Sequence, residues 1–389
     1  MHRFRMGVYQ RRQGQQLVVQ LILPLAAAGV VLAAGAPPPS LEGWPLPAAV
    51  AVASDGSGGL VTWDHATGEL RRWTADGGEA GHCPGDHALA QGDGGPLAAS
   101  GDRALLLFLD AVAGAEQRRK AAVVDLRRCE VVASFVLPGI TLEAAGYRDG
   151  WLLVTNPTSL AEDDVTVWTV DHQGRETSRF DVERALARLT AELHLPAGTR
   201  LAAFKPVVSG REVWILPQAR YELWRPAQSG KPWLRVEPPP CLAATGRALT
   251  GEENVRAVTE FARNLSEPHR TAILEGVKRG ALNPSFRAAV VAATTYRSTL
   301  GVVVRTAVQE RGKRLDLWDM TGPRVIASLP FPDGAHLLAL GDGFAWIRDS
   351  EGRIIRWPLP ERDPSVEFTC ADEAPPSPSP ASTGGPVGR

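Results

Sequence analysis

Short apolar runs separated by turn residues extend along most of the chain. Runs rich in β-branched and aromatic residues recur between Ala48 and Leu359, and the segments that separate them are rich in Gly and Asp. Many short strands at regular spacing, with turn signals between them, are typical of an all-β barrel, sandwich or propeller.

The turns themselves repeat in one context, in which a strand closes with Asp and the next strand begins after Gly. Such turns occur at Trp63–Glu69, Asp171–Arg175, Trp318–Gly322 and Asp349–Arg353. Asp can bond to its own backbone two residues on and Gly accepts a positive φ, so each is predicted to be a tight hairpin turn. Repeated antiparallel units that bury their faces on their neighbours form closed rings, so the repetition favours a β-propeller.

The strands divide into six units, and a six-bladed β-propeller is the predicted fold. The units are Ala48–Gln91, Pro96–Leu137, Ile140–Asp181, Thr199–Val236, Arg287–Leu329 and His336–Pro360. The last unit has only three strands, so either Val366–Cys370 or Leu41–Leu46 is expected to supply a fourth and close the ring. We expect a Pro-rich linker over 37–47, the propeller over 48–370 and a disordered Pro/Ser/Gly tail over 371–389.

These repeats resemble the broad six-bladed β-propeller class of extracytoplasmic bacterial proteins, over roughly residues 45 to 370. The resemblance lies in the style of the repeat, so no functional residue carries over from it. Trp63-Asp64 and Trp318-Asp319 also resemble WD repeats, but the Gly-His pair of that family appears only once, at Gly81-His82. A seven-bladed WD-like propeller is therefore the alternative fold.

Two segments have helical rather than strand periodicity. Val182, Leu186, Leu189 and Leu193 predict a short amphipathic helix after the third blade. Between the fourth and fifth blades, residues 250–280 predict a helical hairpin, whose first helix begins at a capping box of Thr250 and Glu253. The hairpin is interpreted either as a lid or partner surface, or as an insertion that packs on the blades.

Propeller topology places all of this elaboration on one face. Loops that join successive blades share a face with the loops between second and third strands, and both helical segments are blade-joining. The longer loops at 110–119, 156–164 and 306–313 are second-to-third-strand connections. Binding sites are usually built on loops that a rigid scaffold positions, so we expect the site on this face. We also expect the ring to fold without the hairpin, because each blade is stabilised by its neighbours.

The first 36 residues have the layout of an export signal. An Arg-bearing stretch without acidic residues runs to Gln16, and an apolar run follows from Leu17 to Ala36. This pattern predicts a signal peptide, with an uncleaved membrane anchor as the alternative. We therefore expect an extracytoplasmic location, whether periplasm, cell envelope or secreted.

Cysteine usage fits the same compartment. Cys83, Cys129, Cys241 and Cys370 are scattered without a C-x-x-C motif, which favours disulfides over metal ligation. Cys83 and Cys129 are each predicted to follow the third strand of neighbouring blades, so we expect them to pair. Cys241 with Cys370 then follows by elimination. The cluster His82–His87 contains zinc-ligand types, but its Pro-Gly centre indicates a loop with a half-cystine, and no metal site is predicted.

Composition narrows the partner classes. A hydrophobic content of 44% allows a sizeable core and excludes global disorder. The formal charge is −1, and four arginines lie in the N-terminal stretch, so the remaining chain is mildly acidic and nucleic acid is not an expected partner. Tryptophans in the predicted strands could stack sugars, but they are better interpreted as packing between blades. The expected partner is a protein or a small-molecule or glycan ligand.

No catalytic motif and no cofactor motif is present, so no cofactor is expected and the catalytic residues are unassigned. Glu143, Lys205 and His336 fall in predicted innermost strands and are candidate ligand-binding residues at the channel, as is Asp163 in a longer loop. A binding or interaction module of the cell envelope is the favoured function. A hydrolase or lyase with a site at the channel mouth is the alternative.

The N-terminal pattern gives a testable prediction: the basic stretch and the apolar run should take the domain across the inner membrane. Fractionation of native host cells, with mass spectrometry of the N-terminus, should find the chain outside the cytosol. A soluble cytosolic protein with residues 1–16 intact would show that this segment is not an export signal.

Overall fold

The computed structural model describes residues 40–370, except 48–49, 87–88, 90–93, 109–118, 138, 158–164, 195–203, 229, 264–268, 280–285, 307–311 and 362–367. Within these residues lie five four-stranded antiparallel sheets, one three-stranded sheet and one two-stranded ribbon. The six larger sheets are the blades of a propeller, and the strands of each blade pair in chain order. The predicted six-bladed fold is confirmed, and the seven-bladed alternative is wrong.

The first three blades are built from consecutive strands. Blade 1 contains β1 (Val50–Ser54), β2 (Leu60–Asp64), β3 (Leu70–Trp73) and β4 (Glu79–Cys83). Blade 2 contains β5 (Gly94–Ser100), β6 (Arg103–Phe108), β7 (Arg119–Asp125) and β8 (Glu130–Leu137). Blade 3 contains β9 (Gly139–Tyr147), β10 (Gly150–Pro157), β11 (Thr166–Asp171) and β12 (Glu176–Phe180).

The described helices all follow blade 3 in the chain. The helix α2 (Glu183–Glu192) leads to blade 4, which contains β13 (Phe204–Ser209), β14 (Glu212–Pro217), β15 (Leu223–Arg225) and β16 (Leu234–Val236). The segment before blade 5 contains η1 (Pro240–Leu242), β17 (Arg247–Ala248), α3 (Gly251–Arg263), α4 (His269–Lys278) and β18 (Phe286–Arg287). Blade 5 contains β19 (Val290–Tyr296), β20 (Thr299–Arg305), β21 (Lys313–Asp319) and β22 (Arg324–Phe331). Blade 6 contains β23 (His336–Gly341), β24 (Phe344–Arg348) and β25 (Ile354–Pro358).

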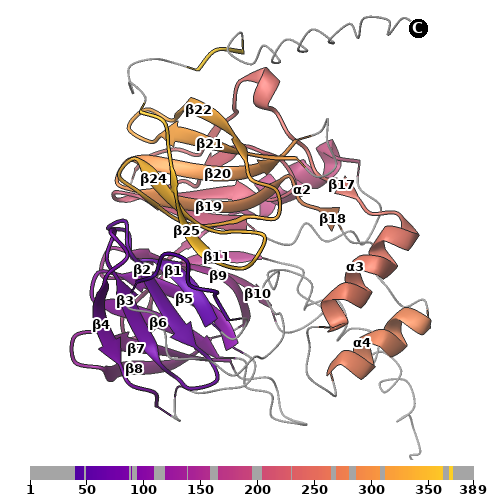
Figure 1. Cartoon of the computed structure of the whole chain (residues 1–389). Helices are drawn as coiled ribbons and strands as arrows, with labels where there is room; N and C mark the ends of the chain where they lie inside the picture. The colour runs from indigo at the N-terminus through magenta and orange to yellow at the C-terminus, as the bar shows by residue number, and fades with distance from the viewer. Residues whose placement is uncertain are drawn as a thin grey trace, which may run out of the picture.

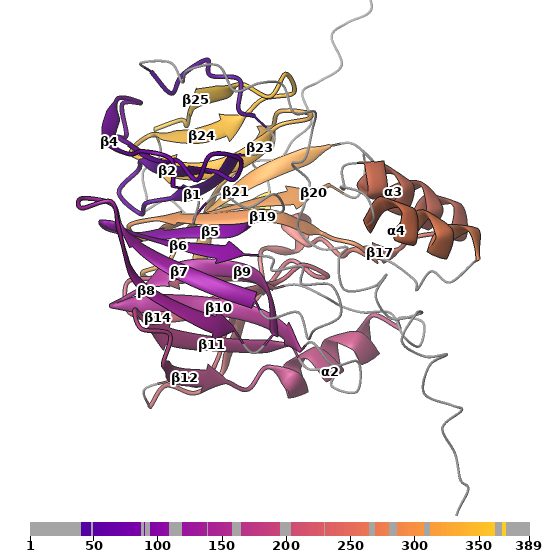
Figure 2. The ribbon, with the colours of Figure 1, turned by 90° about the horizontal axis from the view of Figure 1, so that it is seen from below.

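The two ends of the ring differ in what they carry. The helices α2, α3 and α4 lie on the same side of the blades in both ribbon views (Figures 1 and 2). This end, here called the hairpin face, holds the blade-joining connections and the loops between second and third strands. The opposite end, here called the plain face, holds the turns between first and second and between third and fourth strands. The helical elaboration therefore lies on one face, as predicted, while most residues of the loops at 110–119, 156–164 and 306–313 fall outside the described residues.

Each pair of neighbouring blades shares its own apolar core. Five of the six tryptophans assigned to packing are buried, namely Trp63, Trp168, Trp224, Trp318 and Trp346. Trp63 packs between blades 1 and 2, and Trp318 packs between blades 4 and 5. Trp357 is half-buried and contacts Phe331 of blade 5. These rings fill the space between blades, so stacking of sugars on the five buried rings is excluded.

The N-terminal segment closes the ring along the outer edge of blade 6, where Pro45 forms an isolated antiparallel bridge with Arg353. The Gly43 amide donates to the Ile354 carbonyl at 2.7 Å, and the Ile354 amide donates to the Trp44 carbonyl at 2.9 Å. The Leu41 amide donates to Gly77 of blade 1 at 2.9 Å. The choice between the two termini thus falls on Leu41–Leu46, and the propeller begins before residue 48. Phe368, near the other end, packs instead on the core between blades 4 and 5.

Two disulfides join the predicted pairs, Cys83 to Cys129 and Cys241 to Cys370. The reason given for the first pair is wrong in one respect, because Cys83 ends the outermost strand β4 rather than following a third strand. Cys129 does lie in the turn after β7. The bond therefore joins the outer edge of blade 1 to a turn of blade 2.

The helical segments form as the sequence predicts. Val182 and Leu189 of the α2 region are buried against blades 3 and 4. At the start of α3 the Thr250 amide donates to Glu253 Oε2 at 2.9 Å, and the Glu253 amide donates to Thr250 Oγ1 at 3.3 Å. Arg247 of β17 also binds the Glu253 carboxylate through both terminal nitrogens, at 2.8 and 2.5 Å. Together these bonds hold the pKa of Glu253 down at about 2. Among the described residues, no helix is long and apolar enough to cross a membrane.

Ring closure gives the second prediction. Leu41 is fully buried against Trp73 and Trp346, so Leu41→Ala should lower the free energy of unfolding by about 3 kcal/mol. The neighbouring exposed Glu42→Ala is the matched control and should change it by less than about 0.5 kcal/mol. Chemical denaturation followed by tryptophan fluorescence measures both values. Equal stability of the two variants would mean that the N-terminal segment does not close the ring.

Candidate functional site

The predicted channel residues Glu143, Lys205 and His336 all lie in innermost strands, Glu143 at mid-strand and the other two at the hairpin-face end. Glu143 is in β9, Lys205 is the second residue of β13, and His336 is the first residue of β23. Each innermost strand runs from the hairpin face to the plain face, which places the early positions of a strand near the helices. Asp163 lies outside the described residues.

Glu143 and Lys205 are brought together across the contact between blades 3 and 4. Lys205 Nζ donates to Glu143 Oε1, and only 16% and 19% of the two side chains is exposed. A half-buried ion pair costs much of its attraction in desolvation, but loss of either partner leaves the other charge unpaired. On this side of the channel, the two predicted residues therefore neutralise each other.

His336 lies in a different environment, beside two cations that the sequence analysis did not select. Arg305 is the last residue of β20, and Lys313, the first residue of β21, is its direct cross-strand partner. Lys313 Nζ donates to the carbonyl of Ala335 at 3.0 Å, which brings the ammonium group to the residue before His336. We call Arg305, Lys313 and His336 the cationic rim. Like charges directly opposite in a sheet destabilise it, so this arrangement has a cost.

The electrostatics show that the three groups affect one another. Burial lowers the pKa of His336, and the charges of Lys313, Arg348 and Arg305 lower it further. Burial and the charge of Arg305 likewise lower the pKa of Lys313, against an opposing effect of Asp333. The local field is therefore positive, and the neutral form of His336 is favoured.

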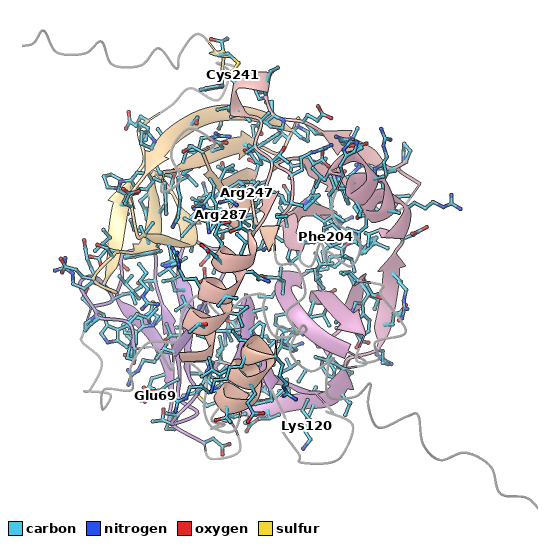
Figure 3. All side chains as sticks on the ribbon, turned by 90° about the vertical axis from the view of Figure 1, so that its right-hand side faces the viewer. Glu69, Lys120, Phe204, Cys241, Arg247 and Arg287 are labelled. Atoms are coloured by element: carbon cyan, nitrogen blue, oxygen red, sulfur yellow. A yellow bond between two sulfur atoms is a disulfide. The ribbon has the colours of Figure 1, made fainter. Side chains whose placement is uncertain are left out.

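The rim continues toward the helical hairpin. The Arg305 amide donates to the Ala289 carbonyl at 2.9 Å, close to Arg287 of the β17–β18 ribbon. Burial and then the charge of Arg287 lower the pKa of Arg305. Figure 3 looks onto the hairpin face and labels Arg287 beside Arg247, with α3 and α4 lying across the same face. The rim thus lies at the base of the insert.

Sequence reasoning missed Arg305 and Lys313 because Arg305 was assigned to the end of a strand and Lys313 to the end of the following loop, and neither was considered as a site residue. The available signal was that the loop at 306–313 follows one basic residue, Arg305, and ends on another, Lys313. Ends of a loop between antiparallel strands are direct neighbours, so the pair was predictable once both strands had been placed. Their closeness to His336 depends on how blade 6 packs, which the sequence pattern does not give.

The plain face has a cavity at the other mouth of the channel, with a volume of about 550 Å³. Its lining is mainly small residues from first-to-second-strand turns: Asp55, Gly56, Ala99, Ser100, Gly101, Gly146, Val208, Ser209, Gly210, Thr295, Arg297, Ser298, Met320 and Thr321. The carboxylate of Asp55 already accepts from the amides of Ser57 and Gly59 at 2.8 and 3.0 Å. Asp55 therefore stabilises its own turn and is not free to act on a ligand.

The described residues hold no group of three or more His, Cys, Asp or Glu side chains placed to bind a metal ion. Within the cluster at 82–87, Cys83 is committed to its disulfide. His82 Nε2 lies 3.2 Å from the Glu69 carboxylate. His82 and Cys83 end the strand β4, and residues 84–86 follow it without regular structure, so the half-cystine lies at a strand end rather than in a loop.

The fold and its faces define the class of protein, a six-bladed β-propeller with a helical insert. No family model and no curated protein matches the chain. Among solved structures, it is similar to the β-propeller domain of Myceliophteria thermophila Cps50 (Swd1), at 9% identity and a TM-score of 0.38, over 80% of this chain and 96% of that one. It is also similar to the Neurospora crassa Pan2 WD40 domain, at 10% identity and a TM-score of 0.37, over 80% and 75%. A protein of unknown function from Bacteroides thetaiotaomicron gives 9% identity and a TM-score of 0.39, over 79% and 68%.

Proposed function

We propose that the chain is a binding module of the cell envelope that recognises its partner with the hairpin face. The observation that carries this proposal is the one-sided elaboration of the ring, in which α2, α3 and α4 all lie on that face (Figure 2). The scaffold beneath is rigid, since every blade is packed between two neighbours. Structures added to one face of such a scaffold are where recognition is usually built.

The plain face carries no helix among the described residues, and its turns resemble those at Asp64 and Asp349 of the hairpin face, whose carboxylates also accept from their own backbones. Its turns use their polar groups on themselves, as the Asp171 carboxylate does in accepting from the amides of Gln173 and Arg175 at 2.8 and 3.0 Å. The Asp125 carboxylate does the same with the amide of Arg127 at 2.9 Å. Side chains bonded within their own turn have little capacity left for a partner.

Location outside the cytosol is part of the proposal. Two disulfides fit an oxidising compartment, and the N-terminal basic and apolar stretch is the pattern of an export signal or an anchor. A partner in the envelope would meet the hairpin face whether the chain is anchored or released. A protein, a glycan and a small molecule each remain a compatible partner at this level.

The hydrolase or lyase alternative is less favoured, because the carboxylates that it would use are engaged. Among the described residues at the two mouths of the channel, the carboxylate of Glu143 is paired with Lys205 and that of Asp55 is held in its own turn. General acid–base chemistry needs a titratable group free to exchange a proton with the substrate. A binding role is therefore the better account of this channel.

The third prediction compares two matched arginines on the two faces. Arg188 of α2 and Arg175 of the β11–β12 turn are 73% and 77% exposed, and each pairs with an acidic residue four positions away. A photo-crosslinking amino acid placed at either site should leave the ring intact. In native host cells, irradiation should give a cross-linked partner from position 188 and none above background from position 175.

A second pair of cross-linking positions repeats the comparison of the two faces independently of the first pair. Val255 of α3 is 42% exposed on the hairpin face, and Arg127 is 78% exposed in the β7–β8 turn of the plain face. Positions 188 and 255 should give the same partner. Cross-links confined to 175 and 127, or none from all four positions, would overturn the proposed function.

A further inference from the structure

We infer that the cationic rim binds an oxyanion, the phosphate or carboxylate group of the ligand that the hairpin face recognises. This inference rests on the proposed function, because it names the ligand chemistry of the same face. The rim takes its two cations and one titratable imidazole from three strands of two blades, with Arg305 on β20, Lys313 on β21 and His336 on β23. These three side chains are therefore brought together by the tertiary fold.

The cationic rim lacks a counter-ion among the described residues. No carboxylate of the described residues forms an ion pair with Arg305, Lys313 or His336, and Nε of Arg305 is buried without a hydrogen-bond partner. Among the described residues, Asp333 is the acidic group that acts on the rim, and it acts on Lys313. A buried charged donor is normally satisfied by a partner, so an unpaired one indicates a missing acceptor.

Several other half-buried cations of the described residues are paired with a carboxylate. Arg314, next to Lys313, donates to the Asp316 carboxylate at 3.1 and 2.9 Å. Lys205 pairs with Glu143. Arg235 also has a buried Nε without a partner, but its Nη2 lies 2.7 Å from the Glu222 carboxylate. The unneutralised pair of Arg305 and Lys313 contrasts with these neutralised cations.

The hydrogen-bond donors of the cationic rim match those that an oxyanion needs. A guanidinium group presents donors in a fixed fork that suits phosphate or carboxylate, and an ammonium group has three donors. Lys313 uses one of these on Ala335, so others remain for a ligand. His336 adds a ring nitrogen that becomes a charged donor when an anion favours its protonation. An oxyanion accepts from all three groups and offsets their mutual repulsion.

The fourth prediction uses the full chain with simple anions as probes. Isothermal titration should show saturable binding of inorganic phosphate and of acetate, with chloride as the background, and the tighter probe identifies the preferred geometry. Arg305→Gln and Lys313→Gln should each weaken binding about tenfold, the loss of one charge-assisted hydrogen bond. Arg188→Gln removes an exposed positive charge from the same face and should change binding by less than about twofold, because exposed charges are screened by salt.

A spectroscopic readout keeps the test independent of folding losses in the variants. The imidazole signal of His336, assigned by its absence in His336→Gln, should titrate at higher pH when the anion is bound. The groups that face this ring are Lys313, Arg348 and Arg305, with Asp333 beyond Lys313, and the three cations lower its pKa in the free protein. Sulfate suits this experiment because its charge stays constant near neutral pH, and its affinity should rise as the pH falls through the pKa of His336.

Three outcomes would overturn the inference. One is the absence of saturable anion binding, and another is an equal loss of affinity in Arg188→Gln and Arg305→Gln. The third concerns Glu310, which lies in the loop between β20 and β21, outside the described residues. If phosphate binds only to Glu310→Gln, the counter-ion belongs to the chain itself. Anion binding without cross-links on the hairpin face would instead refute the proposed function alone.

Discussion

Closure of the ring by the N-terminal segment is the constraint on which the other packing depends. Leu41 and Leu46 complete the core between blades 6 and 1, where they pack with Trp73 and Trp346. Every blade shares a core with each neighbour, so an open ring would expose the faces of two blades at once. A folded domain rarely leaves contiguous apolar surfaces as large as two blade faces exposed to water. The closing segment also couples the first and last blades, which makes the ring one cooperative scaffold.

A closed ring leaves two surfaces with different chemistry. On the plain face, the turn carboxylates of Asp55, Asp125 and Asp171 bind their own backbones. On the hairpin face, the capping box and Arg247 satisfy the start of α3, yet the cationic rim is left without a described counter-ion. The turn carboxylates of Asp64 and Asp349 on the hairpin face also bind their own backbones, so the difference between the faces lies in the helices and the cationic rim. This difference is the physical basis for assigning recognition to one face of a fold that by itself specifies no function.

Turn chemistry and strand spacing were sufficient to predict the blades, because both are local properties. The Asp-Gly turns are present, but Asp64 ends the second strand of its blade and Asp319 ends the third, so the Trp-Asp pairs are not equivalent positions of one repeat. That explains why the WD-like alternative failed. The pairing of Glu143 with Lys205, and the meeting of Arg305 with His336, depend on contacts between blades. Such contacts are set by tertiary packing and leave no periodic signal in the sequence.

The central claim is that the ring is a complete scaffold to which the hairpin is added for recognition. The base of the hairpin is the β17–β18 ribbon, in which Arg247 pairs with Arg287. The most direct measurement is thermal unfolding, followed by circular dichroism, of a variant in which a short Gly-Ser bridge joins Ala248 to Ala281. The account predicts a β-type spectrum and a single cooperative transition like that of the full chain, because loop-closure cost depends weakly on length. A variant that fails to fold would place the hairpin within the core and contradict the account.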